Sequence, residues 1–235
     1  MSTTMKPLAA CLALAVAALL PRPAQADRVD AALAQRFAND WTATCAVAAV
    51  IDGERVETGR YCADSARVAG LDGAFEIGSV SKTMNATLLA ALVADGRLAL
   101  DAPLSRHVPA GTRVPERDGQ AITLRHLATH TAGLPALPPG FAPKNPADPY
   151  AALGNTELAA TPGSAWAYSN FGAMLLSAVI ADAGGGDYDA LIRETVFDPI
   201  GMTSSGIAAL PDGVRAVPGH RPGGETVPAW RFAPA

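Results

Sequence analysis

Ser79 and Lys82 are the two residues of this chain whose types and spacing best suit nucleophilic chemistry. They form a Ser-x-x-Lys sequence within the segment 75–83. If a helix begins at Ser79, Lys82 lies one turn further along the same face. The positive end of that helix would favour an alkoxide or oxyanion at Ser79, and the same field with burial would lower the pKa of the amine. The alternative is a serine that caps the helix beside a solvated lysine.

The scarcity of lysine favours a chemical role for Lys82. Downstream of residue 26 the chain has two lysines, Lys82 and Lys144, against 14 arginines. Positive charge is therefore supplied almost entirely by arginine, which does not give up its proton in proteins. A lysine at position 82 indicates that an amine able to exchange a proton matters there.

A second group of polar residues, Tyr168-Ser169-Asn170, lies just before an apolar stretch that predicts a helix. A phenol has a pKa of about 10 in water and becomes a better base beside a lysine ammonium, which favours the phenolate. The alternative is that Tyr168 is a wall residue and Asn170 a helix cap. The segment therefore indicates catalysis only in combination with Ser79 and Lys82.

Other kinds of catalytic site are disfavoured by the sequence. His126 and His130 have a spacing that suits a metal, but Leu127 stands where the His-Glu-x-x-His motif requires glutamate. There is no Gly-x-Ser-x-Gly elbow, phosphate-binding loop or dinucleotide fingerprint. We therefore expect no metal and no cofactor, and we expect His107, His126, His130 and His220 to be structural or solvated.

The composition excludes several classes of protein. The formal charge is −4, which argues against a protein that binds nucleic-acid phosphates through clustered Lys and Arg. The hydrophobic fraction of 49% is too high for a disordered chain. We expect no nucleic-acid partner, and we expect a monomer.

Residues 1–26 have the pattern of an export signal. Lys6 precedes an apolar run from Leu8 to Leu20, and the small-x-small ending Ala24-Gln25-Ala26 follows. That run is too short for a transmembrane helix, which needs about 20 apolar residues, and we find no later candidate. We expect a periplasmic or secreted protein with one domain over residues 27–235.

The elements that must position these groups are a helix, a β-hairpin and then mainly helices, which is a mixed α/β (α+β) pattern. The hairpin strands are expected at 43–51 and 55–62, with the turn near Asp52-Gly53. Residues 135–149 hold six prolines and should form a non-regular loop. The expected helices cover residues 27–39, 79–94, 123–130, 170–183 and a segment from 187 or 189 to just before 199.

Cys45 and Cys62 flank the expected hairpin. A four-residue loop over 52–55 would place them directly opposite each other, whereas a two-residue loop would place them diagonally and too far apart to bond. An oxidising compartment permits a disulfide. The alternative is that both are small buried hydrophobic residues.

Together with three further segments, these motifs resemble the serine β-lactamase and penicillin-binding-protein superfamily, on its class C side. That side includes class C β-lactamases, D-alanyl-D-alanine carboxypeptidases and related esterases. The resemblance covers about residues 40–235, with every segment in the expected order. The segments that carry it are 75–83, 96–104, 122–135, 168–170 and 199–203.

The resemblance implies a β-lactamase/transpeptidase-like fold, with an antiparallel sheet flanked by helices and a helical lobe. It implies that Ser79 attacks a carbonyl to form an acyl-enzyme and that Lys82 helps to take its proton. Tyr168 would be the base that passes a proton to the leaving group and activates water. Asn170 would hydrogen-bond the substrate amide and Lys82, and the backbone N–H of Ser79 would form half of the oxyanion hole.

The chain departs from the family pattern near its end. The third family motif, Lys or His followed by Ser/Thr and Gly, has no match, because His220-Arg221-Pro222-Gly223 does not fit it. The closing strands and terminal helix are also not found, so we expect a C-terminally truncated member with an incomplete sheet. The resemblance implies an exported serine hydrolase that forms an acyl-enzyme at Ser79, with a small-molecule or peptidoglycan-peptide substrate: β-lactams, D-Ala-D-Ala peptidoglycan peptides or both. The alternatives are a related esterase and an inactive truncated remnant or binding module.

Overall fold

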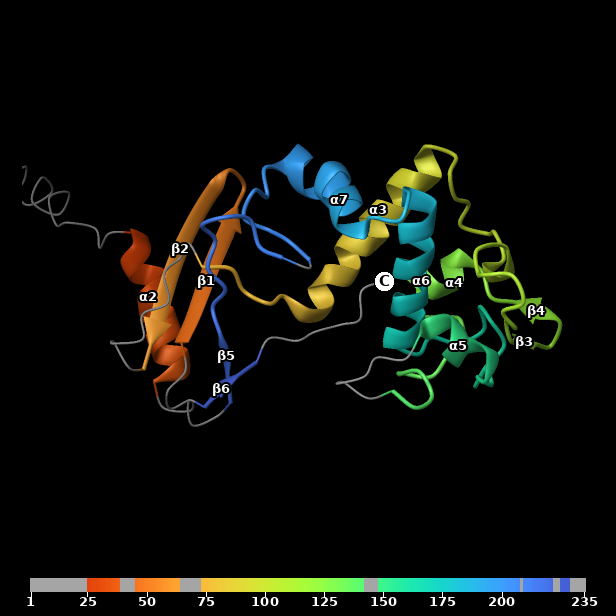
Figure 1. The fold of residues 1–235 in the computed structure, drawn as a ribbon. Helices are drawn as coiled ribbons and strands as arrows, with labels where there is room; N and C mark the ends of the chain where they lie inside the picture. The colour runs from red at the N-terminus through yellow and green to blue at the C-terminus, as the bar shows by residue number, and fades with distance from the viewer. Residues whose placement is uncertain are drawn as a thin grey trace, which may run out of the picture. The chain divides into compact units, whose positions relative to one another are not determined.

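The computed structural model describes residues 25–38, 45–63, 73–141, 148–207, 209–221 and 225–228. The chain divides into two compact units, which we describe separately. The first unit comprises the chain up to Gly73 together with Val217–Pro228, and the second contains Ala74–Ala216. Figure 1 shows the elements of both units, which are mixed helices and small sheets.

The first unit packs helix α2 (Gln25–Phe37) against a hairpin of strands β1 (Cys45–Asp52) and β2 (Arg55–Cys62). Val29 of α2 is buried, and a Cβ at Gly59 of β2 would lie 2.6 Å from the Val29 Cβ. Glycine therefore lets the helix approach the strand closely. The apolar pattern predicted this helix and this hairpin, although α2 begins and ends two residues earlier than the expected 27–39.

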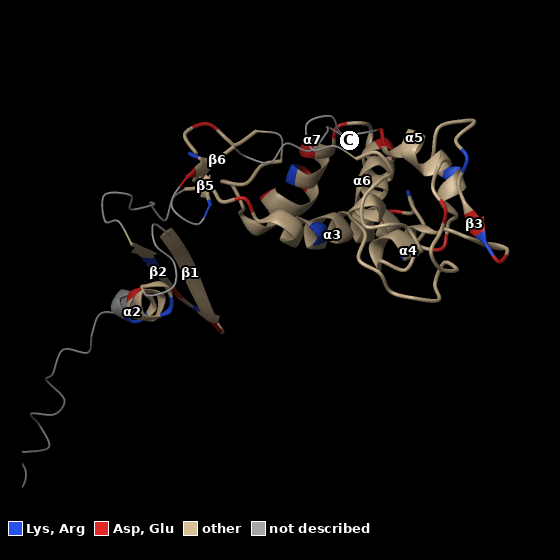
Figure 2. Cartoon of the chain, turned by 90° about the horizontal axis from the view of Figure 1, so that it is seen from below, with Lys and Arg blue, Asp and Glu red and all other residues tan. Residues whose placement is uncertain are grey.

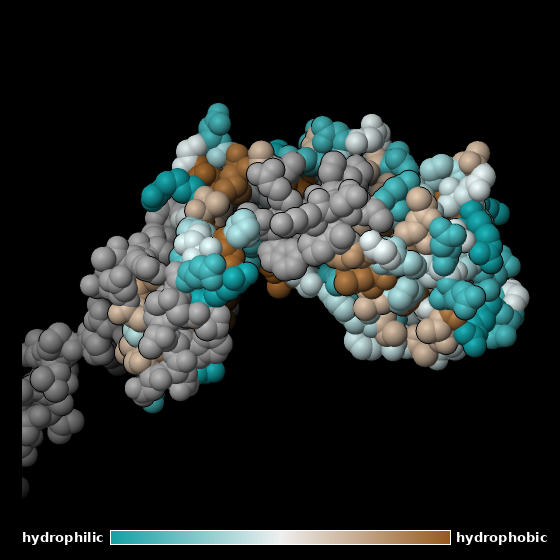
Figure 3. Space-filling model, turned by 60° about the horizontal axis from the view of Figure 1, so that its bottom comes forward, coloured by the Kyte–Doolittle hydropathy of each residue, from teal (hydrophilic) through white to brown (hydrophobic). Residues whose placement is uncertain are grey.

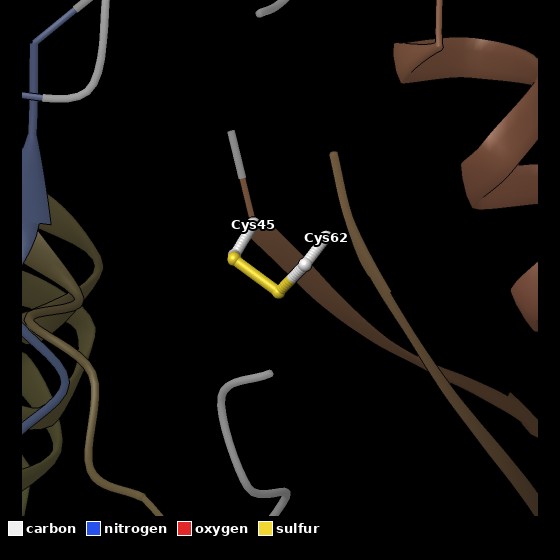
Figure 4. The surroundings of a disulfide bond; sticks show 2 residues. All are labelled: Cys45 and Cys62. Atoms are coloured by element: carbon white, nitrogen blue, oxygen red, sulfur yellow. A yellow bond between two sulfur atoms is a disulfide. The ribbon is translucent and has the colours of Figure 1, made fainter. Parts of the chain in front are cut away.

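The hairpin turn differs from both arrangements considered for Cys45 and Cys62. The ladder continues to the pair Asp52 and Arg55, so the loop is the two residues between them, yet Cys45 lies directly opposite Cys62. The expectation that a two-residue loop would place the cysteines diagonally was wrong, because a loop at Gly53-Glu54 leaves the strand register unchanged. Cys45 and Cys62 form a disulfide at the open end of the hairpin (Figure 4).

The first unit also contains a short strand pair that the sequence did not predict. Strands β5 (Gly219–His220) and β6 (Thr226–Val227) are antiparallel, in a region rich in Gly and Pro. The described strands of the whole chain form three separate two-stranded antiparallel sheets. The third is the pair β3 (Glu116–Arg117) and β4 (Gln120–Ala121) of the second unit, which the sequence analysis also missed.

The second unit is built around the long helices α3 (Ser81–Ala94) and α6 (Asn170–Gly184), which lie side by side (Figure 1). Their apolar faces supply most of the buried core. Each such side chain stabilises the fold by about 1.5–3 kcal/mol when it leaves water. The largest fully buried side chains of these two helices are Leu88, Leu89, Leu92, Phe171, Leu175 and Ile180.

Shorter helices close the core around α3 and α6. Helix α4 (Leu124–Ala128) begins at the predicted cap, where Thr123 and His126 form a reciprocal capping box, and it ends two residues before the expected His130. Helix α5 (Pro149–Gly154) begins at the last proline of the Pro-rich segment, of which residues 142–147 lie outside the described residues. A short 3-10 turn, η3 (Leu104–Arg106), adds the buried Leu104.

The last helical segment is less regular than its periodicity predicted. Asp187 caps helix α7 (Tyr188–Ile192), which passes into a π-helical turn, η4 (Arg193–Phe197), and a 3-10 turn, η5 (Asp198–Ile200). Val196 and Phe197 are buried in this segment, so its apolar pattern looks like that of a regular helix. The pattern therefore could not reveal the change of winding. Within the described part of the chain, every helix is too short or too polar to span a membrane.

Candidate active site

Ser79, Lys82 and Tyr168 meet at the amino-terminal end of α3. The Ser79 Oγ lies 3.0 Å from the Lys82 Nζ and 2.7 Å from the Tyr168 hydroxyl oxygen. Both neighbours are within hydrogen-bond distance of the serine hydroxyl, which is the arrangement that an activated nucleophile requires. The structure therefore brings together the three residues that the sequence analysis selected from two distant motifs.

The helix expected to begin at Ser79 begins at Ser81. Ser79 lies in a 3-10 turn, η2 (Gly78–Val80), that precedes it. Gly78 has φ +52°, a left-handed conformation that glycine adopts without penalty, and it allows the chain to turn into the helix. The Ser81 hydroxyl donates to the Gly78 carbonyl and holds the turn. The backbone N–H of Ser79, the expected oxyanion donor, belongs to this turn.

Lys82 is the one charged residue of α3. Figure 2 shows the blue of a basic residue on this otherwise tan helix. Because Lys82 follows Ser79 by one turn, its half-buried side chain reaches back to the serine oxygen. Its ammonium also lies 5.1 Å from the centroid of the Tyr168 ring. One cation therefore lies beside both hydroxyl groups of the site.

The electrostatics of the site favour the phenolate form of Tyr168. Interaction with the Lys82 ammonium, and then hydrogen bonding with Ser79, lower the pKa of the Tyr168 phenol from its ordinary value. The Tyr168 side chain is 38% exposed, so water can reach it. In the structure the phenol O–H donates to the Ser79 oxygen, and once ionised the phenolate can accept the serine proton.

The start of α6 holds Tyr168 in place. Ser169 is buried and caps this helix, since its hydroxyl accepts from the Gly172 N–H and donates to the Pro135 carbonyl. Asn170 is the first residue of α6, and its backbone N–H donates to the carbonyl of Ala136. Among the hydrogen bonds of the described residues, the Asn170 side chain makes none to Ser79 or Lys82, so its predicted role stays a prediction.

Sequence reasoning missed the part that His130 takes in this site. Its ring centroid lies 4.6 Å from that of Tyr168, and its Nδ1 accepts a hydrogen bond from the Ser169 N–H at 3.2 Å. The sequence analysis expected a structural or solvated histidine. No local pattern could reveal the contact, because it depends on bringing together segments 39 residues apart.

The site uses oxygen and nitrogen groups of the protein itself. Within the described residues, His, Cys, Asp and Glu do not gather in groups of three or more that could hold a metal ion. Apolar side chains reach the surface of the second unit among hydrophilic ones (Figure 3). Two exposed apolar side chains, Val80 and Trp166, are close in sequence to Ser79 and Tyr168. A carbonyl carbon brought to the Ser79 Oγ would find a nucleophile with two proton-exchanging neighbours.

The chain is similar to known proteins over most of its residues. The profile of the Beta-lactamase family matches residues 29–233. The chain is 38% identical over 152 residues to the D-alanyl-D-alanine-carboxypeptidase/endopeptidase AmpH of Escherichia coli (strain K12), a match that covers 62% of this chain and 40% of that protein. It is 31% identical over 171 residues to Esterase EstB of Burkholderia gladioli, with 63% and 42% covered.

A solved structure shows the same fold. The β-lactamase/D-alanine carboxypeptidase from Yersinia pestis complexed with citrate matches 79% of this chain and 57% of its own chain, with a TM-score of 0.67 and 27% identity. The predicted β-lactamase/transpeptidase-like fold is therefore confirmed at this level. The chain spans about two fifths of the length of the curated relatives that it matches. Because the family profile covers most of its residues, the chain belongs to the Beta-lactamase family.

Proposed function

We propose that this chain is a serine hydrolase that forms an acyl-enzyme at Ser79. One observation carries the proposal: the Ser79 Oγ lies within hydrogen-bond distance of both the Lys82 Nζ and the Tyr168 hydroxyl. A serine hydroxyl is a weak nucleophile until a neighbouring base takes its proton. Here the neighbours are the Lys82 ammonium and the Tyr168 phenol, and the positive charge of the first favours the phenolate form of the second, which is a base.

The proposed reaction has two halves. In the first, the Ser79 oxygen attacks a carbonyl carbon while its proton passes to the Lys82–Tyr168 pair, and that proton then goes to the leaving group as the carbonyl–leaving-group bond breaks. In the second, water gives a proton to Tyr168 and attacks the ester, and Ser79 recovers its proton when the acid product leaves. The Ser79 backbone N–H would stabilise the oxyanion in both halves, and Asn170 would bind the substrate amide.

The proposed substrates are β-lactams or peptides that end in D-Ala-D-Ala. Likeness to AmpH and to the Yersinia pestis enzyme supports this substrate class. Likeness to EstB supports a related esterase as the second candidate. All three reactions use the same acyl-enzyme step and differ in the acyl group that is accepted and in the speed of its hydrolysis.

Two further expectations belong to the proposal. We infer that residues 1–26 direct export, so that the enzyme works in the periplasm or outside the cell, where the Cys45–Cys62 disulfide is stable. We also infer that β1 and β2 belong to an antiparallel sheet flanked by helices. The fold match to the Yersinia pestis enzyme supports that inference.

Intact-mass spectrometry after incubation with benzylpenicillin tests the proposal. Wild-type protein should gain the mass of the drug or release hydrolysed drug, and Ser79→Ala should do neither. Ser164→Ala is a matched control, because its hydroxyl is exposed and donates only to the nearby Thr161 carbonyl. The same comparison with a D-Ala-D-Ala peptide and with p-nitrophenyl acetate separates the lactamase, peptidase and esterase candidates. If the wild-type chain neither reacts with nor turns over any of the three, the proposed substrates are wrong, and the chain acts on a substrate of another kind or is inactive.

A further inference from the structure

We propose that His130 is a positioning residue that fixes the phenol of Tyr168 against Ser79. The His130 carbonyl accepts a hydrogen bond from the Ala167 N–H at 2.9 Å, and its Nδ1 accepts one from the Ser169 N–H at 3.2 Å. The two donors are the backbone N–H groups of Ala167 and Ser169, the residues immediately before and after Tyr168. His130 therefore holds the peptide on both sides of the tyrosine.

The imidazole ring supplies a third contact. Its centroid lies 4.6 Å from the Tyr168 ring, with the planes inclined by 40°. The Trp166 ring also contacts the imidazole in a T-shaped arrangement, with the ring centroids 6.3 Å apart and the planes at 85°. Such aromatic pairs restrict the orientation of a ring, so packing against the His130 imidazole limits how the Tyr168 ring can turn.

The backbone conformation of His130 is unusual and allows both contacts at once. His130 has φ +57°, a left-handed conformation that costs a non-glycine residue free energy. A residue keeps such a conformation when the surrounding structure over-determines it. In this conformation both the carbonyl and the side chain of one residue can face the same loop.

The hydrogen-bond pattern also defines the protonation state of His130. Because Nδ1 accepts from the Ser169 N–H, the ring is neutral and carries its proton on Nε2. The titratable groups that face it are Tyr168 on the opposing loop and Lys82 on α3, while His126 lies one turn earlier on its own segment. Burial and then the Lys82 charge lower the pKa of His130, which keeps it neutral.

Two substitutions separate the hydrogen bond from the ring. His130→Asn keeps an acceptor at the position of Nδ1 and tolerates a positive φ, but it removes the ring. His130→Phe keeps a ring against Tyr168 but removes the acceptor. His126→Asn is the matched control, because it changes a nearby histidine that caps α4 and does not touch Tyr168.

The first readout does not depend on activity. In protein labelled with 13Cζ-tyrosine, the Tyr168 resonance is assigned by its loss in Tyr168→Phe and is titrated in each variant. We expect His130→Phe to move the Tyr168 pKa toward its ordinary value and to broaden the resonance, His130→Asn to give a smaller change, and His126→Asn to give none. Thermal unfolding of each variant shows whether the fold is intact.

The second readout rests on the proposed function. The rate of acylation by benzylpenicillin should fall about 100-fold in His130→Phe, since a displacement of about 1 Å at a catalytic group has this effect, and less than 10-fold in His130→Asn. If wild-type protein is not acylated, the proposed function fails while the tyrosine titration still decides the role of His130. A folded His130→Phe variant with a wild-type Tyr168 titration overturns the positioning role.

Discussion

The hydroxyl oxygen of Tyr168 lies 2.7 Å from the Oγ of Ser79, although 89 residues separate the two in the chain. Ser79 precedes α3 and Tyr168 precedes α6, so this distance is set by the packing of the two helices. The buried leucines of α3 and the apolar face of α6 therefore hold the site together as well as the core.

Lys82→Arg should abolish acylation without unfolding the protein. Arginine keeps the positive charge but cannot exchange the proton, so the rate of acylation should fall by at least about 100-fold. Lys144→Arg, at a position outside the described residues, is the matched control and should leave the rate unchanged. Equal acylation by Lys82→Arg and wild type would show that Lys82 acts only through its charge.

Three of the four tyrosines, Tyr150, Tyr168 and Tyr188, should titrate in two groups. The Lys82 ammonium and Ser79 lower the pKa of Tyr168, whereas burial, with Asp182 nearby, raises that of Tyr150, and burial raises that of Tyr188. In 13Cζ-tyrosine spectra recorded against pH, Tyr168 should ionise below Tyr150 and Tyr188.

Replacing Lys82 with methionine tests the cause of this order. Lys82→Met removes the ammonium while keeping a long apolar side chain, so the pKa of Tyr168 should rise toward its ordinary value. Tyr150 and Tyr188 then serve as internal references whose titrations stay constant. An unchanged Tyr168 titration in Lys82→Met would mean that Lys82 does not set its pKa.

Gly133→Ala should destabilise the fold far more than Gly140→Ala. The two glycines have nearly equal φ, +73° and +72°, but a Cβ at Gly133 would overlap the Ala160 carbonyl, whereas one at Gly140 would meet nothing within 4 Å. The unfolding free energy should fall by about 1–2 kcal/mol at Gly140, from the backbone alone, and by about 3 kcal/mol or more at Gly133. Urea unfolding monitored by circular dichroism measures both, and equal losses would show that the loop at Ala160 moves aside.

Much of the fold and of the site followed from local sequence. The capping box at Thr123, the long apolar helices and the hairpin all have signals within a few residues, and the Ser79-x-x-Lys82 spacing placed the amine correctly. The contact of His130 with Tyr168 had no such signal, because it depends on a left-handed backbone and on a loop packed against it. The π-helical turn η4 was also missed, because the apolar pattern indicates that Val196 and Phe197 are buried but not how tightly the chain winds there.

Stability should decrease as the pH falls below about 6.5. Burial lowers the pKa values of His107, His126 and His130 from 6.5. At pH values between the folded and the unfolded pKa, the unfolded chain therefore binds more protons than the folded chain. The stabilisation from these neutral histidines is complete above 6.5 and is lost as the pH drops through their folded pKa values. Urea unfolding at pH 7.5 and 5.5 should show this loss, and a smaller one in His130→Asn. No loss in the wild type would contradict the lowered pKa values.

Reduction of the Cys45–Cys62 disulfide should destabilise the first unit. The bond closes a loop with a sequence separation of 17, for which the chain-entropy treatment gives about 3 kcal/mol. Cys45→Ser with Cys62→Ser should lower the unfolding midpoint. A midpoint equal to that of the oxidised wild type would show that the hairpin is stable without the bond.

The position of that disulfide also limits how the hairpin can assemble. Cys45 and Cys62 are the outermost pair of the ladder, at the end opposite the turn. A shift of one residue would turn every side chain of a strand to the other face of the sheet. With both ends of the ladder tied, by the turn and by the sulfur atoms, no such shift is accessible. In an oxidised chain whose helices have unfolded, these two strands can therefore pair only in the native register.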